Sequence, residues 1–229
     1  MEDSLSKLIQ NSLIKYSGTD EAHYCGVAAG SIKRRNTVKG LLTAATDILV
    51  SEGVVALTFR KLAGRCDMQV GTLQYYFPSR EDLFRGVMRF ILAGYLEALL
   101  DGPFLEAKNP EDRLRKFLQL QIEDVQKKRS CAIFVGLWDL AQRDGFVSDQ
   151  LEEMYTVERL LLQAMLADIH PDTDASIIAD KAAVILALLE GMMPIYGPAT
   201  SLMADTSRVY AAAMDALCQI SGIPAPTAP

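Results

Sequence analysis

Histidine and cysteine are scarce in this sequence, and their placement argues against catalysis or metal binding. The 229 residues include two histidines and four cysteines. His23 lies in an expected linker and His170 at an expected helix end, and neither has a nucleophile and a carboxylate placed around it. The cysteines have no paired spacing; they are Cys25, Cys66, Cys131 and Cys218. Because this scatter favours buried, reduced thiols over zinc ligands or disulfides, we expect no catalytic residue, no metal and no cofactor.

Enzyme motifs, membrane segments and a secretory signal are missing as well. The chain contains no glycine-rich phosphate loop, no HExxH and no GxSxG, so an enzyme is the less favoured class. No apolar run approaches the roughly 18 residues that a membrane-spanning helix needs. Glu2 and Asp3 stand where a secretory signal would have basic residues. We therefore expect a cytoplasmic protein with no membrane partner.

Strand-like alternation is also absent, and apolar residues recur at helical spacing instead. Val38, Leu41 and Ala45 begin one such stripe, which predicts a helix over residues 34–52. The expected fold class is therefore all-α, with about nine helices besides the N-terminal segment. Expected later starts are Gln69, Ser79, Pro110, Ser130 or Cys131, Ser148, Asp174 and Thr206 or Ser207, and expected ends include Gly53, Pro78 and Gly222.

The N-terminal segment, residues 1–30, supports two interpretations. Leu5, Ile9 and Tyr16 fall near helical spacing, which predicts a short amphipathic helix. An isolated helix of this length is marginal in water, so it needs a surface to pack on. Residues 17–30 are rich in glycine, alanine and polar side chains, a composition typical of a linker. The segment is either a helix docked on the body or on a partner subunit, or a disordered tail.

The stretch of residues 58–83 has the spacing of a helix-turn-helix followed by a longer helix. Thr58 can cap the first helix, and Asp67 can adopt the left-handed conformation of the turn that follows. A second helix of about two turns is expected over residues 69–77. Ser79, with an acidic residue three positions further on, fits a capping box that starts the next helix.

Basic residues are concentrated around this stretch, although the whole chain carries a net charge of −6. Residues 31–89 contain ten basic and five acidic side chains, whereas the rest of the chain contains 13 basic and 24 acidic ones. Local positive charge of this kind attracts DNA phosphates. Lys33, Arg34 and Arg35 lead into the first helix of the segment and either contact phosphates or are solvated. The pattern predicts a basic DNA-reading segment joined to an acidic body.

The run LTFRKLAGRCDMQVGTLQYYFPSREDLF resembles the N-terminal DNA-binding domain of the TetR family, the tetracycline-repressor-like transcriptional regulators. With the helix before it, the resemblance covers residues 33–89. It rests on a Thr-capped helix, Leu-Ala, a turn, Gly-Thr-Leu, an aromatic cluster and a Ser-Arg start to the next helix. The sequence departs from the family pattern at Asp67 in place of glycine, Gln69 in place of serine and Gln74 in place of tyrosine. The first two bear on the turn geometry and the third on which DNA sequence is read.

The resemblance implies which side chains contact DNA. Arg60 would read guanine from the first motif helix, and Gln74 is suited to adenine. Arg80 would hold a phosphate with the help of its helix N-terminus. Tyr76 either holds a phosphate or packs in the core of the domain. The set expected at DNA is Thr58, Arg60, Gln69, Val70, Gly71, Thr72, Gln74, Tyr75, Tyr76 and Arg80.

The resemblance also implies a regulatory body that dimerises through its last two helices and binds a small-molecule effector. Small residues at helical spacing in residues 178–191 and 209–217 agree with close helix packing, although both helices could instead belong to a monomer core. Glu190 and Asp139 could orient a ligand or face solvent. The large or soft side chains expected to line the ligand pocket, each of which could instead be ordinary core, are Phe134, Trp138, Met165, Met192 and Tyr196.

These expectations define a domain plan and a function. The plan is an N-terminal extension (1–30), a three-helix helix-turn-helix domain (31–78), a larger helical ligand-binding and dimerisation domain (79–222) and a tail (223–229). The expected function is a ligand-responsive transcriptional regulator, a repressor that binds a palindromic DNA operator as a homodimer and is released by a small hydrophobic or amphipathic ligand. The alternative is a helical interaction protein of the same fold that does not bind DNA. The sequence does not specify the operator, the effector, or whether the regulator represses or activates transcription.

Overall fold

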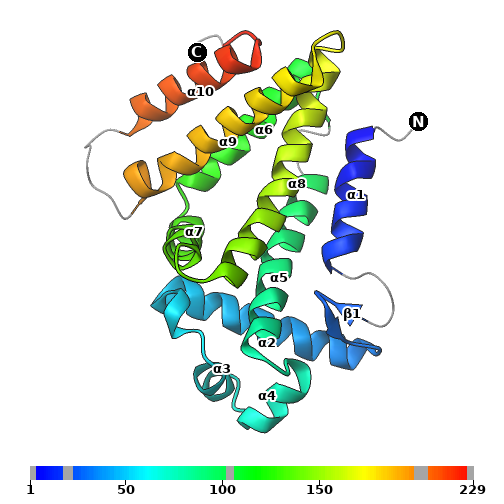
Figure 1. Cartoon of the computed structure of the whole chain (residues 1–229), viewed down its shortest axis with the longest axis vertical. Helices are drawn as coiled ribbons and strands as arrows, with labels where there is room; N and C mark the ends of the chain where they lie inside the picture. Colours follow the sequence, from blue (N-terminus) through cyan, green and yellow to red (C-terminus); the bar gives the residue numbers. More distant parts are fainter. Residues whose placement is uncertain (1–3, 18–22, 102–105, 199–205, 226–229) are drawn as a thin grey trace. The chain divides into compact units, whose positions relative to one another are not determined.

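The computed structural model describes residues 4–17, 23–101, 106–198 and 206–225, and helices dominate these ranges (Figure 1). They contain ten α-helices, one short 3-10 helix and one two-stranded sheet. The chain divides into two compact units, which we call the first unit (Met1–Leu100 with Ala132–Met154) and the second unit (Asp101–Cys131 with Tyr155–Pro229). The expected all-α fold is confirmed, and the functional division at residue 78 stays a prediction.

The first unit contains the N-terminal elements and the helix-turn-helix. Its elements are α1 (Ser4–Ser17), β1 (His23–Tyr24), β2 (Val27–Ala28), α2 (Ile32–Glu52), η1 (Val54–Ala56), α3 (Phe59–Arg65), α4 (Val70–Tyr76) and α5 (Arg80–Leu100). Helix α2 contacts α3 and α5, and α3 contacts α4. The core of this unit lies where these helices meet, and Leu42, Leu62 and Phe77 are fully buried in it.

The second unit is built on helices that come later in the chain. Helices α6 (Pro110–Val125), α9 (Ala175–Tyr196) and α10 (Ser207–Ser221) contact one another. The division between the units falls within α7 (Lys128–Ala141) and within α8 (Gly145–Ile169). Phe117 and Leu118 of α6 and Leu217 of α10 are fully buried in the core of the second unit.

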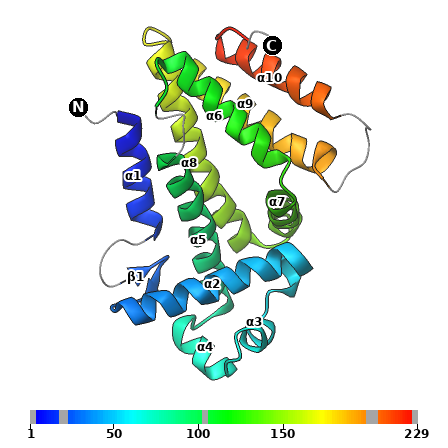
Figure 2. The same cartoon turned by 180° about the vertical axis from the view of Figure 1, so that it is seen from behind.

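Helix α1 packs on α5, so residues 4–17 form a docked helix and not a disordered tail (Figures 1 and 2). Leu5, Ile9 and Tyr16 of α1 are buried. Burying an aliphatic side chain of this size contributes about 1.5–3 kcal/mol to stability. Helix α5 therefore provides the packing surface that a short helix needs. An ion pair between Lys15 Nζ and Glu153 Oε1, 3.9 Å apart, joins α1 to the part of α8 within the first unit.

A β-hairpin follows α1, and here the expectation of a strand-free linker was wrong. Strands β1 and β2 pair antiparallel, with His23 opposite Ala28 and Tyr24 opposite Val27. The two turn residues, Cys25 and Gly26, both have positive φ, 51° and 79°. This is the backbone that tight two-residue hairpin turns require. Strands of two residues are too short to show alternation, so the only sequence signal was the Cys-Gly turn.

Most helix boundaries follow the expected capping residues. Gly53 and Gly222 end α2 and α10, and Asp174 caps α9 by accepting a hydrogen bond from the Ser176 N–H. The expected start of α8 at Ser148 was wrong, because Asp144 Oδ1 accepts the N–H groups of Phe146 and Val147. Helix α8 therefore begins at Gly145. Helix α7 likewise begins earlier than expected, at Lys128.

The described part of the chain has no disulfide, no metal-binding cluster and no helix suited to span a membrane. All four cysteines are free, and three of them are buried while Cys66 is partly exposed. The described residues contain no cluster of side chains suited to hold a metal ion. No helix among them is both long enough and apolar enough to cross a membrane.

Candidate nucleic-acid interface

The helix-turn-helix is formed by α3, a tight turn and α4. Thr58 caps α3, because its Oγ1 accepts a hydrogen bond from the Lys61 N–H at 3.2 Å. Asp67 adopts a positive φ of 50°, which places the Met68 N–H 2.9 Å from the Ala63 carbonyl oxygen. Asp67 thus occupies the left-handed region that its glycine-like position requires. The turn geometry is achieved without glycine.

Helix α4 separates a buried face from an exposed one. Leu73 and Phe77 are fully buried and attach the helix to the unit. The residues predicted to face DNA bases are exposed: Val70, Gly71 and Gln74. Space around Gly71 is open, since an added Cβ would meet nothing within 4 Å. Together with exposed Gln69 and Thr72, these side chains form a continuous surface that could enter a DNA groove.

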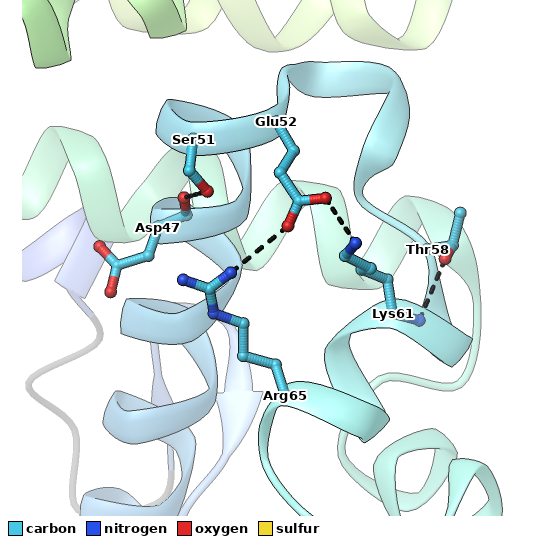
Figure 3. A network of polar contacts seen from close by, with 6 residues as sticks. All are labelled: Asp47, Ser51, Glu52, Thr58, Lys61 and Arg65. Carbon is cyan, nitrogen blue, oxygen red and sulfur yellow. Dashed lines mark hydrogen bonds and ion pairs between the residues drawn. The ribbon is translucent and has the colours of Figure 1, made fainter.

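Glu52 at the end of α2 holds two of the three cations of α3 (Figure 3). Its Oε2 lies 2.5 Å from Lys61 Nζ, and its Oε1 lies 3.4 Å from Arg65 Nη1. Arg60 is exposed and makes no ion pair with any residue that the structure describes. Arg60, which is predicted to read a base, is therefore the cation of α3 that Glu52 leaves available for DNA.

Arg34 of α2 and two tyrosines of α4 form a compact cluster. The Arg34 Nη1 donates a hydrogen bond to the Tyr75 hydroxyl at 2.7 Å. The guanidinium lies 4.5 Å from the ring centre of Tyr75 and 5.3 Å from that of Tyr76. Tyr75 is 65% exposed. Tyr76 is half-buried, which fits neither a fully exposed phosphate contact nor a fully buried core residue. Cation–π contacts of this kind orient both groups, and the sequence indicated Arg34 only as part of a basic cluster.

The start of α5 is fixed by the expected capping box. The Asp82 carboxylate accepts hydrogen bonds from the Ser79 N–H and hydroxyl, and the Asp82 N–H donates to Ser79 Oγ. The hydrogen bonds from Ser79 and Arg85 hold the pKa of Asp82 below its usual range. Arg80 is exposed, with its Nη1 3.7 Å from the Asp144 carboxylate. A DNA phosphate at this helix end would compete with Asp144 for Arg80.

The candidate ligand residues are divided between the two units. Phe134 and Trp138, both half-buried, belong to the part of α7 in the first unit. Met165, Met192 and Tyr196 belong to the second unit, where both methionines are buried. Their role in ligand binding stays a prediction.

The two carboxylates proposed to orient a ligand differ in environment. Asp139 is exposed and forms an ion pair with Arg143, so it behaves as a surface residue. Glu190 accepts a hydrogen bond from the Tyr155 hydroxyl at 3.0 Å. Burial raises the pKa of Glu190 to about 7.

A second buried carboxylate, Glu158, was not among the predicted residues. It accepts a hydrogen bond from Gln121 Nε2. Burial, followed by repulsion from Glu190 and Asp124, raises the pKa of Glu158 to about 8. We call buried Gln121 and Glu158, with the partly buried residues Asp124, Tyr155 and Glu190, the buried carboxylate cluster. Its sequence signal was Glu158 itself, a charged residue in a stripe of buried side chains that includes Met154, Leu161 and Met165.

Comparison with known proteins agrees with this architecture. Residues 41–87 match the family of bacterial regulatory proteins named tetR, and residues 110–220 match the C-terminal domain of BetI-type transcriptional repressors. A helix-turn-helix with this exposed α4 surface, followed by such a domain, defines a DNA-binding transcription regulator. The chain belongs to the TetR family of transcriptional regulators, which are not enzymes.

Particular relatives are similar at low sequence identity. An uncharacterized HTH-type transcriptional regulator in the dhlA 5′ region of Xanthobacter autotrophicus is 26% identical over 163 residues, which cover 70% of this chain and 79% of that protein. A TetR transcription regulator from Haloarcula marismortui shares the fold with a TM-score of 0.65 at 18% identity, over 82% of this chain and 97% of the other. Salmonella enterica GusR has the same TM-score at 19% identity, over 82% and 96%.

Proposed function

We propose that this protein is a ligand-responsive repressor that binds a palindromic operator as a homodimer. The observation that carries the proposal is the exposed α4 surface, on which Val70, Gly71 and Gln74 are presented by a helix fixed through buried Leu73 and Phe77. Such a helix fits the major groove, where a glutamine can pair with adenine. The regulator would act on chromosomal DNA in the cytoplasm.

The homodimer is supported by an exposed apolar face on α9. Ile177, Val184 and Ile195 are 49%, 52% and 47% exposed. Between them Ala183, Ala187 and Gly191 recur every fourth residue and are also exposed. Small residues at this spacing allow two helices to approach closely, while the aliphatic side chains fill the gaps between them. A two-fold dimer formed on this face would carry two copies of α4 to two half-sites.

The effector would bind in the helical body, where it must favour one of two states of the dimer to change operator affinity. The match to a BetI-type repressor domain supports a repressor that such a ligand releases. The predicted ligand residues are soft and apolar, which suits a small hydrophobic or amphipathic compound.

The test is an electrophoretic shift with the DNA next to the protein's own gene, joined to a measurement of solution mass. We expect a dimer that shifts this DNA, and loss of the shift when a compound that raises the melting temperature is added. Val184→Glu should give a monomer with much weaker operator binding, whereas the same change at exposed Val55 should leave the mass unchanged. A wild-type monomer, or no shift at low salt, would refute the proposal.

A further inference from the structure

A cavity of about 310 Å³ lies entirely within the first unit, between the β-hairpin and the helix-turn-helix. The hairpin contributes His23 and Ala28 to its lining, and α2 contributes Arg34. Helix α4 contributes Tyr75 and Tyr76, next to the surface proposed to read DNA. The hairpin lies outside both matched family segments, which begin at residues 41 and 110. The hairpin side of the pocket therefore lies outside the matched segments, whereas its α4 and α5 side lies within residues 41–87.

Arg34 has an unused hydrogen-bond donor in this pocket. Its Nη1 bonds the Tyr75 hydroxyl, but its Nε–H is buried and has no hydrogen-bond acceptor among the described residues. Buried donors are rarely left without an acceptor, because the lost hydrogen bonds to water are not replaced. An acceptor supplied by a bound molecule would complete the site.

The net charge of the pocket is positive. The Asp82 carboxylate, the acidic group in the lining, is already bonded by Ser79 and Arg85. Burial, with repulsion from Glu97, raises the pKa of Cys25 to about 12, so this thiol adds no negative charge. Arg34 is left without a carboxylate partner. The ligand that fits this charge and the unused N–H is an anion.

Phosphate is the anion that the geometry favours. A guanidinium offers donors in a planar fork that matches phosphate oxygens, and tyrosine hydroxyls are common phosphate partners. Because Tyr75 and Arg34 lie beside the exposed face of α4, a duplex held by that face would bring its own backbone phosphates to the pocket. A free phosphate compound is the other source of the same group.

We propose that this pocket binds a phosphate group, and that the backbone of the bound DNA supplies it, so that the hairpin is part of the DNA interface. The choice of DNA as source rests on the proposed function, whereas the phosphate site does not. The hairpin would then close one side of the phosphate position, while Tyr75 and Tyr76 hold Arg34. Residues 23–28 would extend the interface beyond the helix-turn-helix.

The test compares two substitutions of nearly the same shape, of which only one places a negative charge in the pocket. Ala28 is exposed at the pocket wall, so Ala28→Asp should repel a phosphate while Ala28→Asn, which has nearly the same shape, should not. Arg34→Gln removes the guanidinium proposed to bind the phosphate. Lys128→Gln removes a charge from the exposed start of α7 and serves as its control. The full-length variants would first be compared in melting temperature.

Two titrations read the result. In the first, a labelled duplex that wild type shifts is titrated at several salt concentrations. Ala28→Asp and Arg34→Gln should bind about tenfold more weakly, as expected for loss of one charge-assisted hydrogen bond. Their salt slopes should fall by about one, while Ala28→Asn and Lys128→Gln stay within about twofold of wild type. In the second, inorganic phosphate is added to DNA-free protein while the NMR signal of the Arg34 Nε–H is followed.

The outcomes distinguish DNA from a free phosphate compound as the source of the phosphate group. They also separate failure of the phosphate site from failure of the proposed function. Weaker DNA binding by the Asp but not the Asn variant supports the site with DNA as the source. Unchanged DNA binding, with phosphate saturating the Asn but not the Asp variant, supports the site and assigns it to a free phosphate compound. Equal behaviour of Asp and Asn variants in both titrations overturns the proposal. If wild type binds no duplex, the proposed function fails, and the phosphate titration still decides the pocket.

Discussion

The reading surface of α4 and the buried carboxylate cluster differ in how the chain assembles them. The first consists of neighbouring residues between positions 69 and 74, whose exposure follows from one short helix with a buried face. The second combines side chains from α6, α8 and α9, which are far apart in sequence. A site made of neighbours carries its own spacing signal, whereas a site made of distant residues exists only after the helices have packed.

The comparison also concerns energy. The exposed α4 residues contribute little to folding stability, so stability does not restrict which residues stand at these positions. The buried carboxylates lower the stability of the second unit when they are ionised, because charge is costly to bury. Substitutions of the exposed α4 residues should therefore leave the stability nearly unchanged, whereas replacing a buried carboxylate should change it.

The largest expected effect is on stability, from Phe77→Ala on the buried face of α4. Phe77 is fully buried, and truncating a buried phenylalanine costs about 3–5 kcal/mol. Urea unfolding should show this loss, and DNA binding should fail because α4 is no longer fixed. Gln74→Ala, on the exposed face of the same helix, should change stability by less than about 0.5 kcal/mol. Similar losses for both variants would contradict the division of α4 into two faces.

The next effect is a pH dependence that Glu158 gives to the second unit. Its pKa is raised to about 8 from an ordinary 4.5, so between these pH values the folded state keeps a proton that the unfolded state has released. Stability should therefore fall as pH rises through this window, by at most about 1.4 kcal/mol per pH unit for one group. Glu158→Gln should flatten the dependence, as measured by urea unfolding at pH 6 and pH 8.

Exposed Glu123 provides the control for this measurement. Glu123→Gln makes the same chemical change on the surface of α6 and should leave the wild-type slope in place. If Glu158→Gln keeps the full slope, the ionisation of Glu158 is not its source.

The smallest effect is on DNA preference and separates Gln74 from Arg80. Gln74→Ala should relax the preference at one base pair by about 1–3 kcal/mol, because it removes a base contact. Arg80→Ala should instead weaken binding to all sequences and lower the salt slope by about one, because it removes a phosphate contact. Binding to an operator and to single-base variants at two salt concentrations would measure both. Equal loss of sequence preference in the two variants would refute the assignment.

The helix-turn-helix was predictable because its signals are local. Thr58, Asp67 and Ser79 each act through hydrogen bonds or backbone angles within a few residues, and each occupies the conformation expected of it. Helix α8 shows that even local signals can leave a choice between two start residues. Ser148 and Asp144 are both good caps, and only the folded chain shows that Asp144 is used.

The remaining features were not predictable because they depend on packing between distant segments. The docking of α1 required knowing that α5 offers a complementary face. The sharing of Glu52 by Lys61 and Arg65 depends on the angle between α2 and α3. For the same reason the carboxyl of Glu158 could be seen in the sequence, but not the Gln121 amide that meets it.

The contact between α1 and α5 has a consequence for how the protein is made. Helix α1 ends at Ser17 and α5 begins at Arg80, so the ribosome must add the residues between them before α1 has its partner. At a synthesis rate of about 5–20 residues per second this wait is on the order of ten seconds. During that time Leu5 and Ile9, buried in the finished protein, stay exposed on the nascent chain. Chaperones that bind short apolar segments should therefore meet this protein first at its N-terminus.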